Sequence, residues 1–346
     1  MRKYRIAVIP GDGVGPEIVS ETLRLLNEVG FNAEYIHINA GLKYYGETGK
    51  PIEDNAIDTI KNCHATLKGP IATPPTPKFN SVNVWLRKSL NLYVNVRPFK
   101  SWRGISVKDN VDIVLLRENL EGLYSGIEFK CDSVAVTLRV ISKAEVKKVC
   151  RFAFEYAMKN GRGKVTVVHK ANILRETDGL FRQVFYEIAR NYPTIKHNEV
   201  IVDAAAYKLI LAPEEFDVLV TPNLYGDILS DLIAGLIGSI GLCGSALIGD
   251  ELAVFEPIHG VAWDIAGRGI ANPIGEIHAA ILMLKWLSER YSDEKLYRLA
   301  KSIEEATRGV VEDKGVKTLD LGGLSLIHIS EPTRPLYISY AVFCLK

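Results

Sequence analysis

The sequence predicts an α/β fold, and two features of the chain carry that prediction. Short runs rich in β-branched residues recur, and segments with apolar residues at helical spacing separate them, as in parallel-sheet α/β proteins. We expect segment 70–80, which holds four of the 15 prolines, to form an irregular loop. The predicted helices include 15–29, 144–159 and 276–290. The predicted strands lie at 4–9, 33–38, 111–117, 164–169, 198–202 and 216–221.

Length and composition limit the classes of protein that the chain can represent. Its 346 residues suit two lobes or one large α/β unit. The 42 Lys and Arg residues nearly balance the 41 Asp and Glu residues, which gives no support to nucleic-acid binding. Five separated cysteines without a CxxC pair indicate reduced thiols, not a disulfide framework or a zinc site. No stretch approaches the roughly 18 apolar residues that span a bilayer, so we expect a cytoplasmic protein without membrane or nucleic-acid partners.

Residues 324–346 differ in style from the rest of the chain. They follow LDLGG and mix bulky apolar residues with prolines, without helical or strand periodicity. The string LSLIHISEPTR resembles the translation of a common sequencing-adapter sequence. We interpret this segment as a non-native or disordered tail, with a natural tail as the alternative, and assign it no function.

The strongest chemical signal is the segment 223–238, NLYGDILSDLIAGLIG. Asp227 and Asp231 are four residues apart on a helical pattern, so both carboxylates project from one face. Like charges at this spacing repel and their neighbours are strongly apolar, which weakens the interpretation as two solvated surface acids. Ligands that are all oxygen select hard cations, so the pair predicts a Mg²⁺ or Mn²⁺ site.

Charged residues also stand at the ends of three predicted strands. Asp203 follows 198–202, Lys170 follows 164–169, and Arg117 ends 111–117. Open α/β sheets present functional groups at the carboxyl ends of their strands, although a lone lysine there is more often a solvated cap. Because charged residues recur at three strand ends, the interpretation as solvated caps is weaker for the set than for any one of them.

Two arginines, Arg87 and Arg97, lie in the segment 81–100, with Ser81 and Asn83 upstream of them. Guanidinium groups bind carboxylates bidentately, so converging arginines suit a di- or tricarboxylate. For this segment alone, a pair of structural salt bridges is an equally good interpretation.

Two glycine-rich stretches invite a nucleotide-binding interpretation. The loop 9–18, IPGDGVGPEI, spaces its glycines as GxGxG and not as GxGxxG, so we reject a Rossmann site there. The second stretch, 256–273 (EPIHGVAWDIAGRGIANP), suits a loop around a nucleotide or an ordinary surface loop.

Taken in order, these motifs resemble the β-decarboxylating dehydrogenase family of isocitrate, isopropylmalate and homoisocitrate dehydrogenases. The resemblance implies a two-lobed α/β fold with mixed sheets flanked by helices, not a Rossmann fold. Residues 1–97 with 248–323 would form the large cofactor-binding lobe, and 98–247 the small lobe with the dimer interface and the metal site. The most specific stretches are IPGDGVGPEI, LYVNVRPFK, REN followed by EGLYSG, VHKAN, LYGDILSDL and DIAGRGIANP, within residues 4 to about 323.

The resemblance also implies roles for individual residues. Tyr124 would protonate the product carbon, and Lys170, reaching across a dimer, would take part in removing the hydroxyl proton. Asp227 and Asp231 would bind the divalent metal together with an Asp203 supplied by the neighbouring subunit. The substrate carboxylates would be held by Arg87, Arg97 and Arg117.

The loop 256–273 implies NAD as the cofactor. Asp264 and Ile265 match the NAD-type members, because an acid there can bond a ribose 2′-hydroxyl and would repel a 2′-phosphate, whereas NADP-type members carry a Lys-Tyr pair. The other cofactor-binding positions that the resemblance implies are Thr73, Asn83, His259, Gly260 and Asn272.

Ser81 and Asn83 favour isocitrate as the substrate, because isopropylmalate enzymes usually place apolar residues nearby. The implied reaction is oxidative decarboxylation to 2-oxoglutarate in a homodimer or higher homo-oligomer with shared active sites. Homoisocitrate and isopropylmalate are alternatives, and so is a weakly active regulatory subunit of a hetero-oligomer. Leu120, Val261 and Trp263 depart from the family pattern, but the metal, arginine, tyrosine and lysine positions are intact, so we expect activity.

Overall fold

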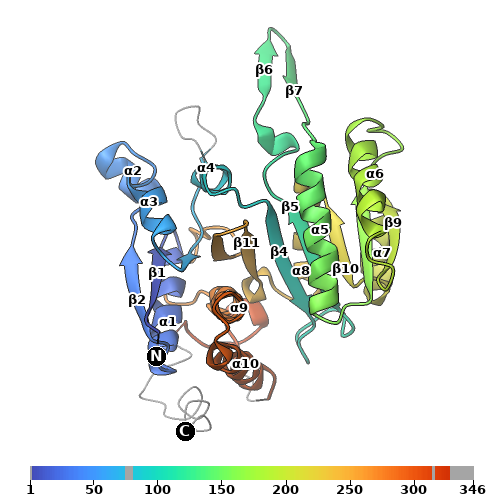
Figure 1. Ribbon diagram of the computed structural model, residues 1–346. Coiled ribbons are helices and arrows are strands. Elements are labelled where there is room, and N and C mark those ends of the chain that lie inside the picture. Colours follow the sequence, from blue (N-terminus) through green and yellow to red (C-terminus); the bar gives the residue numbers. More distant parts are fainter. Residues whose placement is uncertain (1, 75–80, 314–315, 328–346) are drawn as a thin grey trace.

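The computed structural model describes residues 2–74, 81–313 and 316–327, and these form a ten-stranded mixed sheet covered by helices on both faces (Figure 1). The strand order is β2-β1-β3-β12-β11-β4-β5-β10-β8-β9. The strands of this sheet are β1 (Tyr4–Ile9), β2 (Ala33–His37), β3 (Ala65–Lys68), β4 (Val94–Lys100), β5 (Asp112–Glu118), β8 (Lys164–His169), β9 (Lys196–Ile201), β10 (Val218–Thr221), β11 (Gly244–Ile248) and β12 (Ala253–Pro257).

The helices alternate with these strands along much of the chain, as the sequence predicts. They are α1 (Gly15–Glu28), α2 (Leu42–Thr48), α3 (Ala56–Lys61), α4 (Val82–Ser89), α5 (Lys143–Lys159), α6 (Thr177–Ala189), α7 (Val202–Leu211), α8 (Asn223–Leu236), α9 (Ile274–Tyr291) and α10 (Glu294–Arg308).

The predicted elements are present, with one shift that matters for the site. All six predicted strands and the three predicted helices occur within two residues of their expected ends. β9, however, ends at Ile201, and Asp203 lies in the first turn of α7. The prediction that Asp203 directly ends a strand is therefore wrong, because the apolar run that suggested a longer strand continues into an amphipathic helix.

The centre of the sheet is antiparallel. β11 runs antiparallel to both β4 and β12, and β4 runs antiparallel to β5, whereas the outer pairs are parallel. The sheet is thus mixed, as the family resemblance implies. The alternation of strands and helices along the sequence does not indicate which strands run antiparallel. The predicted lobe boundaries at 97–98 and 247–248 fall within β4 and β11, so both predicted lobes share this one sheet.

Side chains alternate between two layers of core along each strand. Ile6 and Val8 of β1 pack with residues of α1, α5, α6, α9 and α10 on one face. Ala7 and Ile9 pack with residues of α3 and α4 on the other, where α7 and α8 cover the far half of the sheet. The substrate-binding candidates lie on this second face, between α4 and α8.

A two-stranded arm projects from the body of the protein (Figure 1). It consists of β6 (Glu128–Cys131) and β7 (Val134–Thr137), which pair antiparallel. Large apolar side chains are exposed along and beside it, namely Ile127, Phe129, Val134 and Leu138.

The segment predicted as a tail begins at Leu324, and its first four residues are described. Ile327 is buried, and its backbone N–H donates to the carbonyl of Gly269 at 2.7 Å. Packing therefore continues past the predicted boundary at Gly323, while residues 328–346 lie outside the described part. Among the described helices, none is both long and apolar enough to cross a membrane.

Candidate active site

A cavity of about 450 Å³ opens between α4, the middle of β4, the carboxyl-terminal end of β5, and α8. Ser81 caps the start of α4, where its side-chain oxygen accepts the N–H of Val84 at 3.4 Å. Ten of the residues predicted from the sequence line this cavity: Thr73, Ser81, Asn83, Arg87, Arg97, Arg117, Tyr124, Asp227, His259 and Gly260.

The three predicted arginines are buried together in this cavity, and Arg117 is only 1% exposed. Among the described residues, Nε of Arg87, Nε of Arg97 and Nη2 of Arg117 have no hydrogen-bond partner. Burial, with the neighbouring Arg97 and Arg87, lowers the pKa of Arg117 to about 9. A polyanion between the arginines would offset their mutual repulsion and use the spare donors.

Asp227 forms ion pairs with two of the three arginines of the cavity. Its Oδ1 contacts Nη1 of Arg117 and lies 3.3 Å from Nη1 of Arg97, and its Oδ2 accepts the hydroxyl of Tyr124 at 2.7 Å. Burial alone would raise the pKa of Asp227, but Arg117 and Arg97 hold it below its ordinary value. Burial raises the pKa of Tyr124, so its phenol keeps a proton that it can donate.

Asp231 follows one turn after Asp227 on α8, as the spacing predicts. Burial raises its pKa, and the negative charge of Asp227 adds to this effect while Arg97 opposes it. The described residues contain no group of three or more His, Cys, Asp or Glu side chains that could hold a metal ion. Within the chain, Asp203 therefore does not join the two carboxylates of α8 in a metal-binding group.

Lys170 and Asp203 form a second, separate half of the predicted site. The ammonium of Lys170 lies 2.5 Å from Oδ1 of Asp203, and neither residue lines the cavity of the arginines. The two residues meet because β8 and β9 are adjacent and parallel, so the segments that follow these strands lie side by side.

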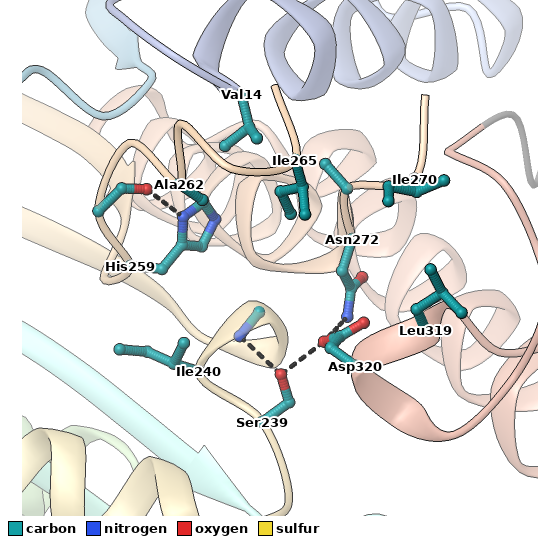
Figure 2. A pocket seen from close by; sticks show the side chains of 13 residues that line it. Val14, Ser239, Ile240, His259, Ala262, Ile265, Ile270, Asn272, Leu319 and Asp320 are labelled. Atoms are coloured by element: carbon teal, nitrogen blue, oxygen red, sulfur yellow. Dashed lines mark hydrogen bonds between the residues drawn. The ribbon is translucent and has the colours of Figure 1, made fainter. Parts of the chain in front are cut away.

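A second cavity, of about 440 Å³, contains several of the predicted cofactor-binding residues (Figure 2). His259, Gly260, Ile265 and Asn272 line it, and His259 and Gly260 also line the arginine cavity. The two cavities therefore adjoin. Asp264 is exposed beside Ile265 and does not line the second cavity, and Thr73 and Asn83 lie in the first.

The glycine loop 11–15 supports this second cavity. Gly13 has a positive φ of 58°, and a Cβ there would meet the carbonyl oxygen of Val261 at 1.9 Å. The next residue, Val14, donates its N–H to the same carbonyl at 2.9 Å and lines the cavity. The loop brings its backbone against the 256–273 segment, which is a different task from that of a Rossmann loop.

Several residues of the two cavities were not singled out from the sequence. Lys68 and Glu256 form a buried ion pair of 2.5 Å at the wall of the arginine cavity. Asp320 lies in the second cavity, where its Oδ2 accepts from Asn272 at 3.0 Å and from Ser239 at 2.5 Å (Figure 2). Lys68 ends a short apolar run as Lys170 does, which is a signal that could have indicated it.

Comparison with known proteins gives this geometry a family. A family model described as isocitrate/isopropylmalate dehydrogenase matches residues 5–334. The chain belongs to the isocitrate/isopropylmalate dehydrogenase family. Members of this family are decarboxylating dehydrogenases that generally use a divalent metal and a nicotinamide cofactor, so the chain is a dehydrogenase of this kind.

Relatives within the family carry different substrate names. The 3-isopropylmalate/3-methylmalate dehydrogenase of Methanocaldococcus jannaschii is 42% identical over 326 residues, which cover 92% of this chain and 94% of that protein. The isocitrate/homoisocitrate dehydrogenase of Thermus thermophilus is 43% identical over 323 residues, or 92% and 94% of the two chains. The crystal structure of isocitrate dehydrogenase from Methylococcus capsulatus superposes with a TM-score of 0.90 at 41% identity, over 98% of this chain and 99% of that one.

Proposed function

We propose that the protein catalyses the metal-dependent oxidative decarboxylation of isocitrate to 2-oxoglutarate with reduction of NAD. The observation that carries this proposal is the group of three buried arginines, Arg87, Arg97 and Arg117, each with a buried donor that lacks a partner among the described residues. Unpaired buried donors are costly, and a substrate with several carboxylates would satisfy them.

The polar wall near the start of α4 favours isocitrate over a substrate with an alkyl group. The hydroxyl of Thr73 donates to that of Ser81 at 3.1 Å. The side-chain amide of Asn83, whose N–H group donates to the carbonyl of Ile71 at 3.3 Å, lines the same cavity. The ammonium of Lys68 lies on the same cavity. Hydroxyl, amide and ammonium groups suit a third carboxylate better than a hydrocarbon.

Isopropylmalate is the second candidate, and two observations favour it. Ile71 and Val84 also line the cavity, and they would accept an alkyl group. The Methanocaldococcus jannaschii relative is named for 3-isopropylmalate and 3-methylmalate. Homoisocitrate, which keeps the third carboxylate on a longer chain, stays an alternative on the evidence of the same polar wall.

The residues of the chain divide the chemistry between them. The arginines would hold the substrate carboxylates and withdraw them from water. Lys170 would accept the proton of the 2-hydroxyl as the bond to hydrogen at the same carbon breaks. After loss of carbon dioxide, the phenol of Tyr124 would deliver a proton to the carbon that carried the carboxylate.

Two bound groups would complete the reaction. The oxygen-only donors Asp227 and Asp231 fit Mg²⁺ or Mn²⁺, with Asp203 of the partner subunit as the third carboxylate. The chemistry supplied by these groups would be a lowered pKa of the substrate hydroxyl and stabilisation of negative charge from the ion, and hydride acceptance from the nicotinamide. The adjoining cavity lined by His259, Ile265 and Asn272 fits the adenosine part of the cofactor.

The proposed preference for NAD rests on Asp264. Asp264 is exposed and precedes Ile265, which lines the second cavity, so its carboxylate would repel a 2′-phosphate that reached it. The guanidinium of Arg268 lies 3.2 Å from the carbonyl oxygen of Asp264, where it partly offsets that charge. We expect a higher kcat/KM with NAD than with NADP, and the double substitution Asp264→Lys with Ile265→Tyr should reverse the order.

A shared active site would explain why the candidate residues form two groups in one chain. Lys170 and Asp203 pair with each other, away from the cavity that holds Tyr124 and Asp227. In a twofold dimer, the Lys170 group of each subunit would complete the cavity of the other. Mixing inactive Lys170→Ala and Asp227→Ala proteins should then restore activity, since some hybrids contain one intact site.

The deciding experiment is a parallel assay of NAD reduction with isocitrate, homoisocitrate and isopropylmalate, with Mg²⁺ or Mn²⁺ and with chelator. Chelator-sensitive turnover that is strongest with isocitrate supports the proposal. Ser81→Leu should lower isocitrate turnover and also lower the Tm slightly, because it removes the cap of α4. Strongest turnover with isopropylmalate would move the assignment to the second candidate. A folded protein that is inactive with all three acids would favour a regulatory subunit.

A further inference from the structure

The turn that carries Lys170 is held from behind by a buried carboxylate. Lys170 follows β8, and its backbone N–H donates to Oδ2 of Asp178 at 2.7 Å. The carbonyl of Lys170 accepts the N–H groups of Ile173 and Leu174 at 3.0 and 2.9 Å, which closes the turn. The position of the Lys170 backbone, and with it the direction of the Lys170 side chain, therefore depends on the placement of Asp178.

Asp178 is itself fixed by an ion pair. Its side chain is 0% exposed, and its Oδ1 lies 2.7 Å from Nη2 of Arg139. The guanidinium carbon of Arg139 lies 4.6 Å from the ring centroid of Tyr225, which holds the arginine from its other side. A buried carboxylate without its cation is strongly disfavoured, so Asp178 and Arg139 must move together.

Three elements meet at this ion pair. Asp178 begins α6, Arg139 follows β7 of the arm, and Tyr225 lies on α8 two residues before Asp227. The contact thus links the turn of Lys170 with the helix that carries the metal carboxylates and with the base of the arm. Neither Asp178 nor Arg139 lines the arginine cavity.

We infer that Asp178 and Arg139 are positioning residues that set Lys170 for proton removal in the active site of the partner subunit. This inference rests on the proposed function, in which Lys170 takes the hydroxyl proton across a dimer. The ion pair touches neither substrate nor cofactor and acts only through the Lys170 backbone. It belongs to the Lys170 half of the shared site and not to the Tyr124 half.

The first test compares two substitutions at opposite ends of β8. Asp178→Asn keeps the size of the side chain and one acceptor but removes the charge that holds Arg139. Asp217→Asn is the matched control, because Asp217 also accepts backbone N–H groups, from Gly163 and Lys164, and also pairs with an arginine, Arg162, at 3.1 Å. Misplacement of a reacting group by about 1 Å can cost on the order of 100-fold.

For Asp178→Asn we expect kcat to fall about 10- to 100-fold, with KM values for isocitrate and NAD within about 2-fold of wild type. For Asp217→Asn we expect a lower Tm with kcat within about 2-fold of wild type. Equal kcat losses in both variants, or a loss confined to KM in Asp178→Asn, would overturn the inference. If Asp178→Asn does not fold, Arg139→Gln replaces it with the same expectations.

The second test assigns the defect to one half of the shared site. Asp178→Asn mixed with Tyr124→Phe should regain about a quarter of the wild-type rate, because half of the dimers are hybrids with one intact site. Asp178→Asn mixed with Lys170→Ala should regain nothing beyond the sum of the parents, since both defects lie in the same half. Recovery in that second mixture would contradict positioning of Lys170.

A further mixture separates this inference from the proposed function. Lys170→Ala with Tyr124→Phe should recover activity if the sites are shared. If it fails although subunit exchange is proven with two affinity tags, the shared site is wrong. The kcat of Asp178→Asn against that of Asp217→Asn then still decides whether the ion pair positions Lys170.

Discussion

Two adjacent buried charges at the end of β5 face opposite sides of the sheet. Arg117 points into the substrate cavity, and Glu118 turns back to accept the N–H groups of Leu120 and Glu121 at 2.6 and 2.9 Å. Both side chains are almost fully buried. Glu118 therefore holds the backbone of the segment that leads to Tyr124. The free-energy cost of burying Glu118 depends on whether its carboxyl group is protonated.

Burial raises the pKa of Glu118 from 4.5 to about 7, against the effect of those two backbone donors. The folded protein thus keeps a proton that the unfolded chain releases near pH 4.5. The stabilising contribution of this proton is complete below pH 4.5 and is lost as the pH rises towards about 7. In wild type, this group alone should lower the free energy of unfolding over that range by on the order of 1–3 kcal/mol.

Glu118→Gln should remove this pH dependence, because the neutral amide titrates in neither state. Urea unfolding at pH 5 and pH 8 measures the difference. Glu28→Gln, at an exposed position of α1, is the control. Its free energy of unfolding should change between pH 5 and pH 8 as much as that of wild type. If the free energy of unfolding of Glu118→Gln changes between pH 5 and pH 8 as much as that of wild type, Glu118 does not carry this proton.

At the scale of elements, α8 brings Asp227, the proposed metal ligand, close to Arg117 of β5 because Gly226 of the helix has no side chain. A Cβ on Gly226 would lie 2.7 Å from Cγ of Arg117 and 2.5 Å from the hydroxyl oxygen of Thr221. Gly235, near the other end of the same helix, has no atom within 4 Å of its hypothetical Cβ. The glycine next to Asp227 thus serves close packing, and the later one does not.

We predict opposite effects for alanine at these two positions. Gly226→Ala should lower the free energy of unfolding by about 1–3 kcal/mol and displace Arg117, which should raise the KM for substrate. Gly235→Ala should raise the free energy of unfolding by about 0.5–1 kcal/mol, because alanine favours helix. Denaturant unfolding and steady-state kinetics test both, and a neutral Gly226→Ala would show that α8 can move without loss.

At the scale of the whole molecule, the exposed apolar side chains of the β6–β7 arm offer a surface for the second subunit that we propose. Phe129 is 58% exposed on β6, with Val134 on the partner strand β7. Apolar groups that gather on one projecting element indicate an interface. If the active sites are shared, this interface also controls activity.

Phe129→Glu should therefore weaken dimerisation and lower specific activity most at low protein concentration. Light scattering after size-exclusion chromatography and a dilution series of activity measure the two effects. Val107→Glu is the control, since Val107 is 72% exposed in the connection between β4 and β5, away from the arm. A Phe129→Glu protein that remains dimeric and fully active would place the interface elsewhere.

The sequence predicted the elements and many of the site residues because those depend on local spacing. The four-residue interval of Asp227 and Asp231 places both on one face of any helix, and the alternating strands and helices specify an α/β fold. The motif order also sufficed for the family. Arg87, Arg97 and Arg117 could be proposed as substrate ligands because guanidinium groups suit carboxylates, and the structure brings them into one cavity.

Only the tertiary structure decided which of these residues meet. The antiparallel insertion of β11 between β4 and β12 places Ala246 beside Val96 at the centre of the sheet, and no local pattern encodes that pairing of distant segments. The separation of Lys170 and Asp203 from the arginine cavity, and the pairing of Arg139 with Asp178, depend on contacts between elements far apart in the chain. Periodicity records which face of an element is buried, but the partner across that face is chosen by packing of the whole chain.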